Sequence, residues 1–288
     1  MSKNKPNGMI LDVERRLPKV KVTYFLMYAV MIMVSIVILL PICWMLLSSL
    51  KDTKEFLQIP PTVFPKNPDP AKFLDVWHKS SIGTAYASTV VMVGGMVICD
   101  LLINGLAGYA LSRLKPKGFK FILAFCAWLM MIPNNLSMVP RFISFINHGM
   151  SDSYIPFWMM AGCNAFNVLL FKNFFDNIPK ALVEAARLDG CTEFGIFYKI
   201  VVPLSKPIVM TVSIFTFTGG WGNFLFPYLL IKDSAMQPIA IKLYTLKEVL
   251  SVDEYMVVLI WAIIPPLIVF FLLQKYVMQG MDGGGVKG

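Results

Sequence analysis

The sequence predicts an all-α membrane protein with six transmembrane helices. Hydrophobic residues make up 57% of its 288 residues, and the mean hydropathy is +0.65. Charged residues account for only 15%, whereas a soluble domain typically carries roughly 25%. This much apolar surface cannot be hidden in one soluble core, which excludes an ordinary soluble enzyme, a disordered chain and a collagen-like fibre.

Six apolar runs are each long enough to cross a hydrocarbon layer, which takes about 20 residues. They cover residues 24–47, 86–111, 119–139, 154–171, 207–231 and 255–273. The first run follows a basic segment but is longer than the apolar part of a signal peptide, and no small-residue cleavage site follows it. We therefore expect a cytoplasmic segment over 1–22 and a single transmembrane domain over 23–288.

The basic residues set the orientation of these spans. Of the 26 Lys and Arg, 17 lie on the side of the N-terminus when the six runs are taken as spans. Cytoplasmic loops concentrate Lys and Arg, so both termini are predicted to be cytoplasmic. The net charge of +9 thus marks membrane topology, and nucleic acid is not an expected partner.

Two loops stand out by their length. The external segment 48–85 is rich in proline and mixed in charge, which predicts irregular structure instead of a folded domain. The cytoplasmic loop 172–206 has a different pattern, because it predicts two short helices where a simple connection needs only about 2–8 residues. This loop is the expected docking element.

Within the cytoplasmic loop, the first helix is predicted to start with Pro179 in its first turn and to end at Gly190, which can adopt the left-handed conformation. Thr192 can cap a second helix that stops before Pro203. The first helix is expected to present Ala185 and Ala186 as a flat surface. An amphipathic helix on the membrane surface is the alternative.

The segment from Glu184 to Gly190, followed by Ile200-Val-Val-Pro203, resembles the EAA motif of bacterial ABC importer permeases. The family pattern is E-A-A, three residues, G, nine residues and I-x-L-P, and Val202 stands where Leu is usual. In that family the motif forms a coupling helix that docks on a cytoplasmic ATPase. The resemblance implies ATPase-coupling residues at Glu184, Ala185, Ala186, Arg187, Gly190, Ile200 and Pro203.

Weaker patterns extend the resemblance to the MalG-like permeases of carbohydrate importers. They are Asn104-Gly-Leu-Ala-Gly-Tyr-Ala-Leu-Ser-Arg113, Met131-Ile-Pro133, Trp221-Gly-Asn223 with Pro227, and Gly283 to Gly288. The resemblance implies the MetI-like architecture of type I importer permeases, in the bacterial cytoplasmic membrane. It also implies a second permease subunit in a heterodimer, two ATPase copies that bind ATP and Mg²⁺, and an extracellular sugar-binding protein.

The chain itself offers no catalytic or metal-binding pattern. It contains two His and five Cys, without a C-x-x-C pair, and its glycine-rich end lacks the G-K-[ST] of a phosphate-binding loop. No enzymatic activity, cofactor or metal is therefore expected on this chain.

Polar residues inside the apolar runs must face protein or water, because lipid offers them no partner. Asp100 is expected to bond with Asn104, one turn away, or to stabilise a pair of permeases. Amides beside aromatic rings suit sugars, whose hydroxyls and C–H faces need both. The candidate pathway residues are Asn134, Asn135, Asn164, Asn167, Trp221, Asn223 and Tyr228. The alternative is that these amides only hold helices together.

We therefore expect a permease subunit that moves an oligosaccharide or other sugar by alternating access. Few cationic side chains lie between the span ends, which favours a neutral solute. A glycerol phosphodiester or a polyol is the alternative within transport. A membrane-embedded enzyme or a receptor with a signalling loop is the alternative outside it.

Overall fold

The computed structural model describes residues 18–282, and all regular elements in that range are helices. In chain order they are α1 Pro18–Ser49, α2 Thr53–Phe56, α3 Lys72–Ser80, α4 Ile82–Cys99, η2 Asp100–Asn104, α5 Gly105–Tyr109, η3 Ala110–Leu114, α6 Phe119–Met131, η4 Asn134–Ser137, α7 Met138–Asn147, α8 Ile155–Gly162, α9 Ala165–Asp176, α10 Lys180–Leu188, α11 Glu193–Ile196, η5 Phe197–Val201, α12 Val202–Leu204, α13 Lys206–Trp221, α14 Leu225–Leu230, α15 Ile239–Leu246 and α16 Val252–Asp282. Residues 1–17 of the predicted N-terminal segment, and the glycine-rich end 283–288, lie outside the described residues.

Three unbroken helices are long and apolar enough to cross a membrane. They are Lys21–Ser49 in α1, the continuous run Ile82–Leu114 from α4 to η3, and Val252–Tyr276 in α16. A helix rises about 1.5 Å per residue, so each exceeds the roughly 30 Å of a hydrocarbon layer. They coincide with the first, second and sixth predicted spans.

Two sharply bent pairs of helices lie at the third predicted span and at the start of the fifth. α6 ends at Met131, just before Pro133, and the chain bends by more than 40° into the next helix. The helical stretch Glu193–Leu204 meets α13 at 83°. The predicted continuous run over 207–231 was wrong, because α13 ends at Trp221 and the chain turns at Gly222 before α14. Three spans, or up to five with the bent pairs, are present in the described residues.

The fourth predicted span is interrupted at Cys163 and Asn164. Asn164 has an extended backbone, and its side chain caps α9 by accepting the Asn167 N–H at 3.2 Å. Asn side chains favour such caps over helix interiors. The two pieces, α8 with 8 residues and α9 with 12, are each too short to cross alone.

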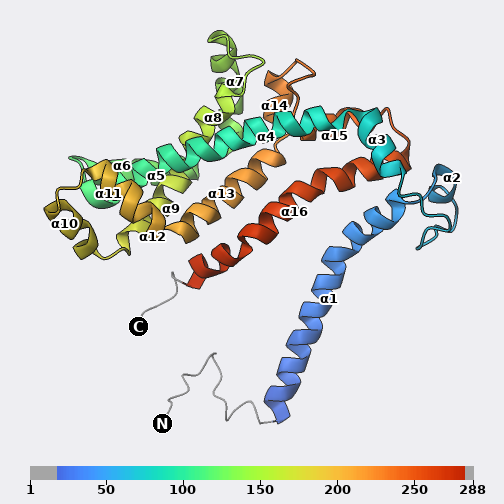
Figure 1. Cartoon of the computed structure of the whole chain (residues 1–288), viewed down its shortest axis with the longest axis horizontal. Coiled ribbons are helices and arrows are strands. Elements are labelled where there is room, and N and C mark those ends of the chain that lie inside the picture. The colour runs from blue at the N-terminus through green and yellow to red at the C-terminus, as the bar shows by residue number, and fades with distance from the viewer. Residues whose placement is uncertain (1–17, 283–288) are drawn as a thin grey trace.

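The helices form one elongated body with α10 at one end and α2 and α3 at the other (Figure 1). α4 packs on α8, α13 and α15, while α13 packs on α16. α5 lies very close to α9, because a Cβ on Gly108 would come within 2.6 Å of the Phe171 Cβ. Glycine is thus required at this crossing, as in other close contacts between membrane helices.

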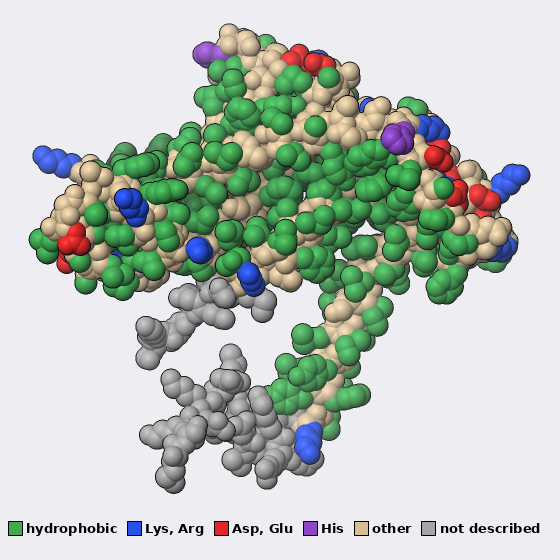
Figure 2. Space-filling model, viewed as in Figure 1, with side chains coloured by type: hydrophobic (Ala, Val, Ile, Leu, Met, Phe, Trp, Pro, Cys, Tyr) green, Lys and Arg blue, Asp and Glu red, His purple; other side chains and the backbone are tan. Residues whose placement is uncertain are grey.

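α1 stands apart from this body and contacts it through α16 (Figure 1). None of its apolar 18-residue window is buried inside the chain, and its hydrophobic side chains are uncovered along its length (Figure 2). Such a surface needs lipid or another protein around it.

The segment between α1 and α4 is more ordered than the sequence predicted. It contains α2 and α3, and Val76 of α3 packs with Ile82, Val257 and Val258 in a buried apolar cluster. The expectation of purely irregular structure was wrong, because the prolines lie between the two short helices and not within them.

Candidate functional site

The cytoplasmic loop predicted from the sequence forms a helix, a glycine turn and a second helix. α10 begins at Lys180 and is preceded by Pro179, which lies just outside the helix instead of in its first turn. Gly190 has φ +78°, a conformation that costs other residues about 1–2 kcal/mol. Thr192 accepts a hydrogen bond from the Gly195 N–H at 3.2 Å and caps α11. The helical path continues through Pro203, which falls in the first turn of α12, so the predicted stop before Pro203 was wrong.

The two faces of α10 have different environments. Val183 is 2% exposed and Ala186 is 5% exposed, and both pack in an apolar cluster with Phe175 and Ile196. The sequence predicted that Ala186 lies on an outer surface. This prediction was wrong, because Ala186 faces the core of its own chain. The outer face carries Glu184, Ala185 and Leu188, and Leu188 is 90% exposed.

Polar contacts fix this loop to the inner helices. Arg187 Nε donates to a Glu193 carboxylate oxygen at 2.6 Å, and the Tyr109 hydroxyl donates to the other oxygen at 2.8 Å. The hydrogen bond to Glu193 raises the pKa of the Arg187 guanidinium above its ordinary value. Arg113 donates to the carbonyl oxygens of Phe175 and Ile178 just before α10. α10 is therefore held to η3 and α9 as one unit.

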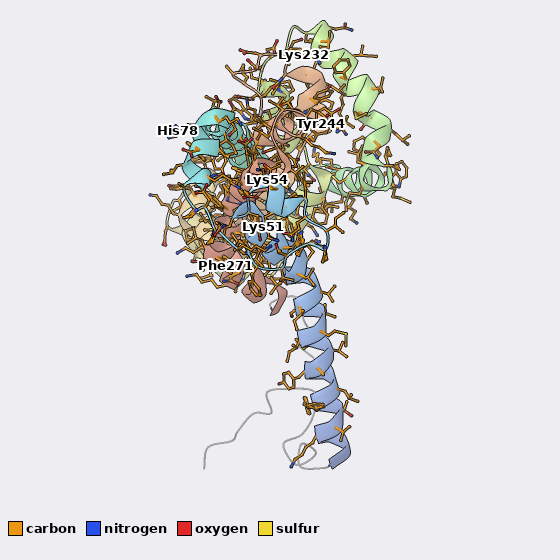
Figure 3. All side chains as sticks on the ribbon, turned by 90° about the vertical axis from the view of Figure 1, so that its right-hand side faces the viewer. Lys51, Lys54, His78, Lys232, Tyr244 and Phe271 are labelled. Atoms are coloured by element: carbon orange, nitrogen blue, oxygen red, sulfur yellow. The ribbon has the colours of Figure 1, made fainter. Side chains whose placement is uncertain are left out.

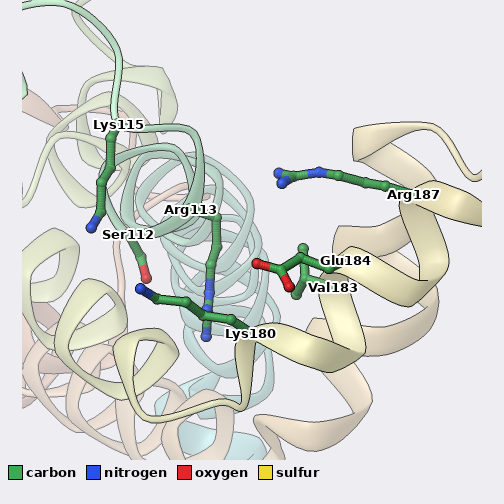
Figure 4. Close-up of a pocket in the computed structure, with 7 residues that line it drawn as sticks. All are labelled: Ser112, Arg113, Lys115, Lys180, Val183, Glu184 and Arg187. Atoms are coloured by element: carbon green, nitrogen blue, oxygen red, sulfur yellow. The ribbon is translucent and has the colours of Figure 1, made fainter.

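A cavity of about 230 Å³ lies between α10 and the end of η3. It is lined by Ser112, Arg113, Lys115, Lys180, Val183, Glu184 and Arg187. Figure 4 shows the Glu184 carboxylate directed from α10 toward η3. Glu184 forms no ion pair within 4 Å in the part of the chain that the structure describes, although its charge contributes to the raised pKa of the Arg187 guanidinium.

The other two residues expected to couple to an ATPase, Ile200 and Pro203, lie outside α10. Ile200 is half-buried against the same apolar cluster, and Pro203 is exposed. Tyr109 and Arg113 were not selected from the sequence, although they hold the loop in place. Their sequence signal is the pattern from Asn104 to Arg113, which contains both residues.

Asp100 is the centre of a buried polar network within the membrane helices. It is 1% exposed and accepts hydrogen bonds from Asn104 Nδ2 at 2.6 Å and from Asn167 Nδ2 at 2.7 Å. Thr216 of α13 donates to the same carboxylate. The predicted bond between Asp100 and Asn104 is confirmed. Because the donors come from η2, α9 and α13, this carboxylate ties three elements together.

The network also supports the break between α8 and α9. Asn104 Nδ2 donates to the Ala161 carbonyl at 2.8 Å, and Asn104 Oδ1 accepts the Asn164 N–H at 3.2 Å. Backbone groups freed at a helix break inside a membrane need such partners. Asn104 thus provides them from the neighbouring helix.

The candidate pathway residues divide into enclosed and accessible side chains. Asn167 is 4% exposed, and Trp221 is 5% exposed with its indole N–H donating to the Ala262 carbonyl at 3.0 Å. Both are packed inside this chain. The accessible members are Asn135, Asn164 and Tyr228, together with the half-buried Asn223. The side chain of Asn134 lies outside the described residues.

Comparison with known proteins identifies the family. Residues 104–283 match the family model described as "Binding-protein-dependent transport system inner membrane component", which is more than half of the chain. The chain belongs to this family. Permeases of this kind are non-enzymatic membrane subunits of ABC transporters, and the ATPase is a separate subunit.

Two curated relatives of this permease come from Bacillus subtilis (strain 168). The polygalacturonan/rhamnogalacturonan transport system permease protein YtcP is 30% identical over 288 residues, covering 91% of this chain and 97% of YtcP. The arabinooligosaccharides transport system permease protein AraQ is 30% identical over 261 residues, covering 89% and 93% of the two chains.

The fold of this permease also occurs in a solved structure. A chain of a bacterial ABC transporter involved in the import of the acidic polysaccharide alginate aligns with a TM-score of 0.78 at 23% identity. The alignment covers 94% of this permease and 99% of that chain. The all-α fold of type I importer permeases predicted from the sequence is therefore present.

Proposed function

We propose that this permease is one of two membrane subunits of an ATP-driven importer for an oligosaccharide, which an extracellular solute-binding protein delivers. The names of YtcP and AraQ support a carbohydrate, since both belong to transport systems for sugar polymers or oligomers. A glycerol phosphodiester or polyol is the alternative solute.

The observation that carries this proposal is the arrangement of α10. One face is fixed in the apolar core by Val183 and Ala186, while the other carries Ala185 and the exposed Leu188, with Glu184 bordering the cavity at η3. A helix held this way moves together with the membrane helices behind it. It therefore suits a coupling helix that transmits motion from a docked ATPase.

In the proposed cycle, two ATPase subunits close around ATP and Mg²⁺ and draw the coupling helices together. The membrane halves rotate and open the pathway toward the binding protein, and hydrolysis resets the transporter. Glu184, Ala185, Arg187 and Gly190 would form or shape the docking surface, with Ile200 and Pro203 supporting the second helix. The solute is moved but not chemically changed.

A second permease subunit is proposed as the partner of α1. The uncovered apolar side chains of this helix along its whole length favour an additional protein partner in the membrane. We further propose six spans, with α8 and α9 as one broken span, and cytoplasmic termini, as the distribution of Lys and Arg favours.

The accessible amides at the helix breaks are the proposed pathway residues on this chain. Asn135 follows the bend after α6, Asn164 lies between α8 and α9, and Asn223 lies between α13 and α14. Interrupted membrane helices expose backbone and polar groups where a solute can reach them. Asn167 and Trp221 are assigned a packing role instead.

The test is co-purification of the complete transporter, followed by an ATPase assay in lipid. Glu184→Ala and Gly190→Ala are expected to reduce ATPase recovery or the stimulation by loaded binding protein by about tenfold, the effect of roughly 1.4 kcal/mol. Gly118→Ala is the matched control, since Gly118 also has positive φ, +82°, and open space around it. A wild-type chain that recovers no ATPase subunit would contradict the proposal.

A further inference from the structure

An exposed group of three aromatic rings lies beyond the end of α13. Phe224 precedes α14, Tyr228 lies in α14, and Tyr244 lies in α15. The ring centroid of Phe224 lies 5.2 Å from the ring centroid of Tyr228 and 5.2 Å from that of Tyr244. The ring centroids of the two tyrosines are 5.8 Å apart. Tyr244 was not recognised from the sequence, since its ring meets Phe224 and Tyr228 only in the folded chain.

We propose that Phe224, Tyr228 and Tyr244 form an aromatic platform that binds a pyranose ring of the transported oligosaccharide. This proposal rests on the proposed function and adds a solute contact to it. Tyr244 provides the most accessible ring, because it is 56% exposed while Tyr228 is 40% exposed.

Several polar groups surround the platform. Within residues 18–282, the hydroxyls of Tyr228 and Tyr244 have no hydrogen-bond partner, and neither does the Asn223 amide side chain. Lys232 places its ammonium 5.6 Å from the Tyr228 ring centroid and donates to the Tyr228 carbonyl oxygen at 3.2 Å. Figure 3 shows Lys232 and Tyr244 in the same upper part of the body, away from α1.

A lipid-facing position does not suit this group. Two phenolic hydroxyls and an amide would lie against hydrocarbon without a partner, which costs several kcal/mol for each unsatisfied group, so this group must face water, protein or a ligand. A sugar satisfies them, since its C–H faces pack on aromatic rings while its hydroxyls bond with amides and phenols.

The platform is held rigidly from both sides. After α14, the Asp152 carboxylate accepts the backbone N–H groups of Lys232 at 2.5 Å and of Asp233 at 2.8 Å. Before α15, Thr89 Oγ1 accepts the Ile239 N–H at 2.8 Å, and Ile239 is 1% exposed. A surface fixed in this way loses little conformational entropy when a ligand binds.

The experiment uses the complete transporter in proteoliposomes, with raffinose, maltotriose and trigalacturonate as probes. The quantity measured is sugar imported per ATP hydrolysed, at saturating binding protein. Tyr244→Ala and Phe224→Ala are expected to lower this ratio about five- to tenfold, whereas Tyr244→Phe, which keeps the ring, changes it less than about threefold. Phe121→Ala is the matched control, because Phe121 is an exposed aromatic residue of another helix at 72% exposure.

Assembly with the ATPase and ATPase stimulation by the binding protein are measured in the same samples. Both are expected to match wild type, which separates this inference from the coupling proposal. An unchanged import ratio in Tyr244→Ala overturns the platform. Loss of assembly or of the response to binding protein overturns it as well, since the rings would then contact a protein. Absence of wild-type import for all three probes contradicts the pyranose assignment. If Tyr244→Ala does not fold, Tyr244→Leu removes the ring at similar volume.

Discussion

The two ends of the membrane body are held together by different interactions. At the α10 end, Tyr109, Phe171, Phe175 and Phe197 form an aromatic core beneath the loop, with Phe171 and Phe175 each 1% exposed. At the opposite end, Val76 of α3 packs on Val257 and Val258 of α16, and charged contacts also join α2 and α3 to the start of α16. Asp253 accepts hydrogen bonds from Lys72 at 2.9 Å and from Thr53 at 2.7 Å.

This difference shows how each end can respond to its partners. A close-packed apolar core resists deformation and transmits a displacement as a whole. The Lys72–Asp253 pair at the other end is largely enclosed, with side chains 12% and 5% exposed, so each charge depends on its own partner and is costly to leave alone. The α10 end therefore suits force transmission, while the α2 and α3 end holds the start of α16 through one specific charge pair.

The largest expected effect breaks the aromatic core. Phe175→Ala removes a fully buried ring and leaves a cavity, and such changes cost about 3–5 kcal/mol. We expect a strong drop in the melting temperature of the purified transporter, together with loss of ATPase coupling. Phe121→Ala, at an exposed site on α6, is the control. An equal loss in both variants would argue against a specific role for the core.

The second-largest effect is expected for the ion pair between Lys72 and Asp253, at the end of the body that contains α2 and α3. Asp253→Ala leaves the Lys72 ammonium, whose side chain is 12% exposed, without its carboxylate. Breaking an ion pair of this burial is expected to cost about 2–4 kcal/mol. Unlike Phe175→Ala, this variant should leave ATPase binding intact and reduce the response to the binding protein. Melting temperature and stimulated ATPase activity measure the two effects.

A smaller effect is expected for the ion pair on the surface of loop 172–206. The Arg187 and Glu193 side chains are 41% and 42% exposed, so water screens their interaction. Arg187→Ala should change the free energy of unfolding by less than about 1 kcal/mol. Any reduction in ATPase recovery beyond this small loss would then report contact with the partner. Stability and recovery are measured in parallel, and a large stability loss would show that the pair is structural.

The smallest effect concerns pH. Backbone N–H groups of Asp233 and Lys232 bond to Asp152 and hold the pKa of its carboxyl below the ordinary value. A lowered pKa in the folded state means that the stabilisation is complete above the unfolded pKa of about 3.9 and is lost as the pH falls through the folded pKa. Melting temperatures between about pH 7 and about pH 3 should show a weaker acid dependence in Asp152→Asn than in wild type. Identical pH dependence of the melting temperature in the two proteins would show that the Asp152 carboxylate does not contribute to acid sensitivity.

Much of the fold was accessible from the sequence because the membrane imposes simple rules. Long apolar runs predicted α1, the run Ile82–Leu114 and α16. Gly190 and Thr192 predicted the turn after α10 and the cap of α11. These features depend on local backbone chemistry and on hydropathy, which neighbouring residues in the chain already specify.

The helix breaks were harder to predict, because they depend on partners distant in the chain. Asn164 interrupts the fourth run where Asn104, 60 residues earlier, accepts its backbone N–H. α13 ends at Trp221, whose indole N–H donates a hydrogen bond to the Ala262 carbonyl oxygen of α16. Hydropathy does not reveal such contacts, since an apolar run reads the same whether it is straight or broken.

By itself, the sequence determined that this protein lies in a membrane and that loop 172–206 forms two helices around a glycine turn, and it offered the bond between Asp100 and Asn104 as one of two roles for Asp100. Only the tertiary structure decided which polar and aromatic side chains remain accessible. It enclosed Ala186, Asn167 and Trp221, and it brought Tyr244 beside Phe224 and Tyr228. The physical reason is that residue type sets what a side chain can bind, whereas packing between distant helices sets what it can reach.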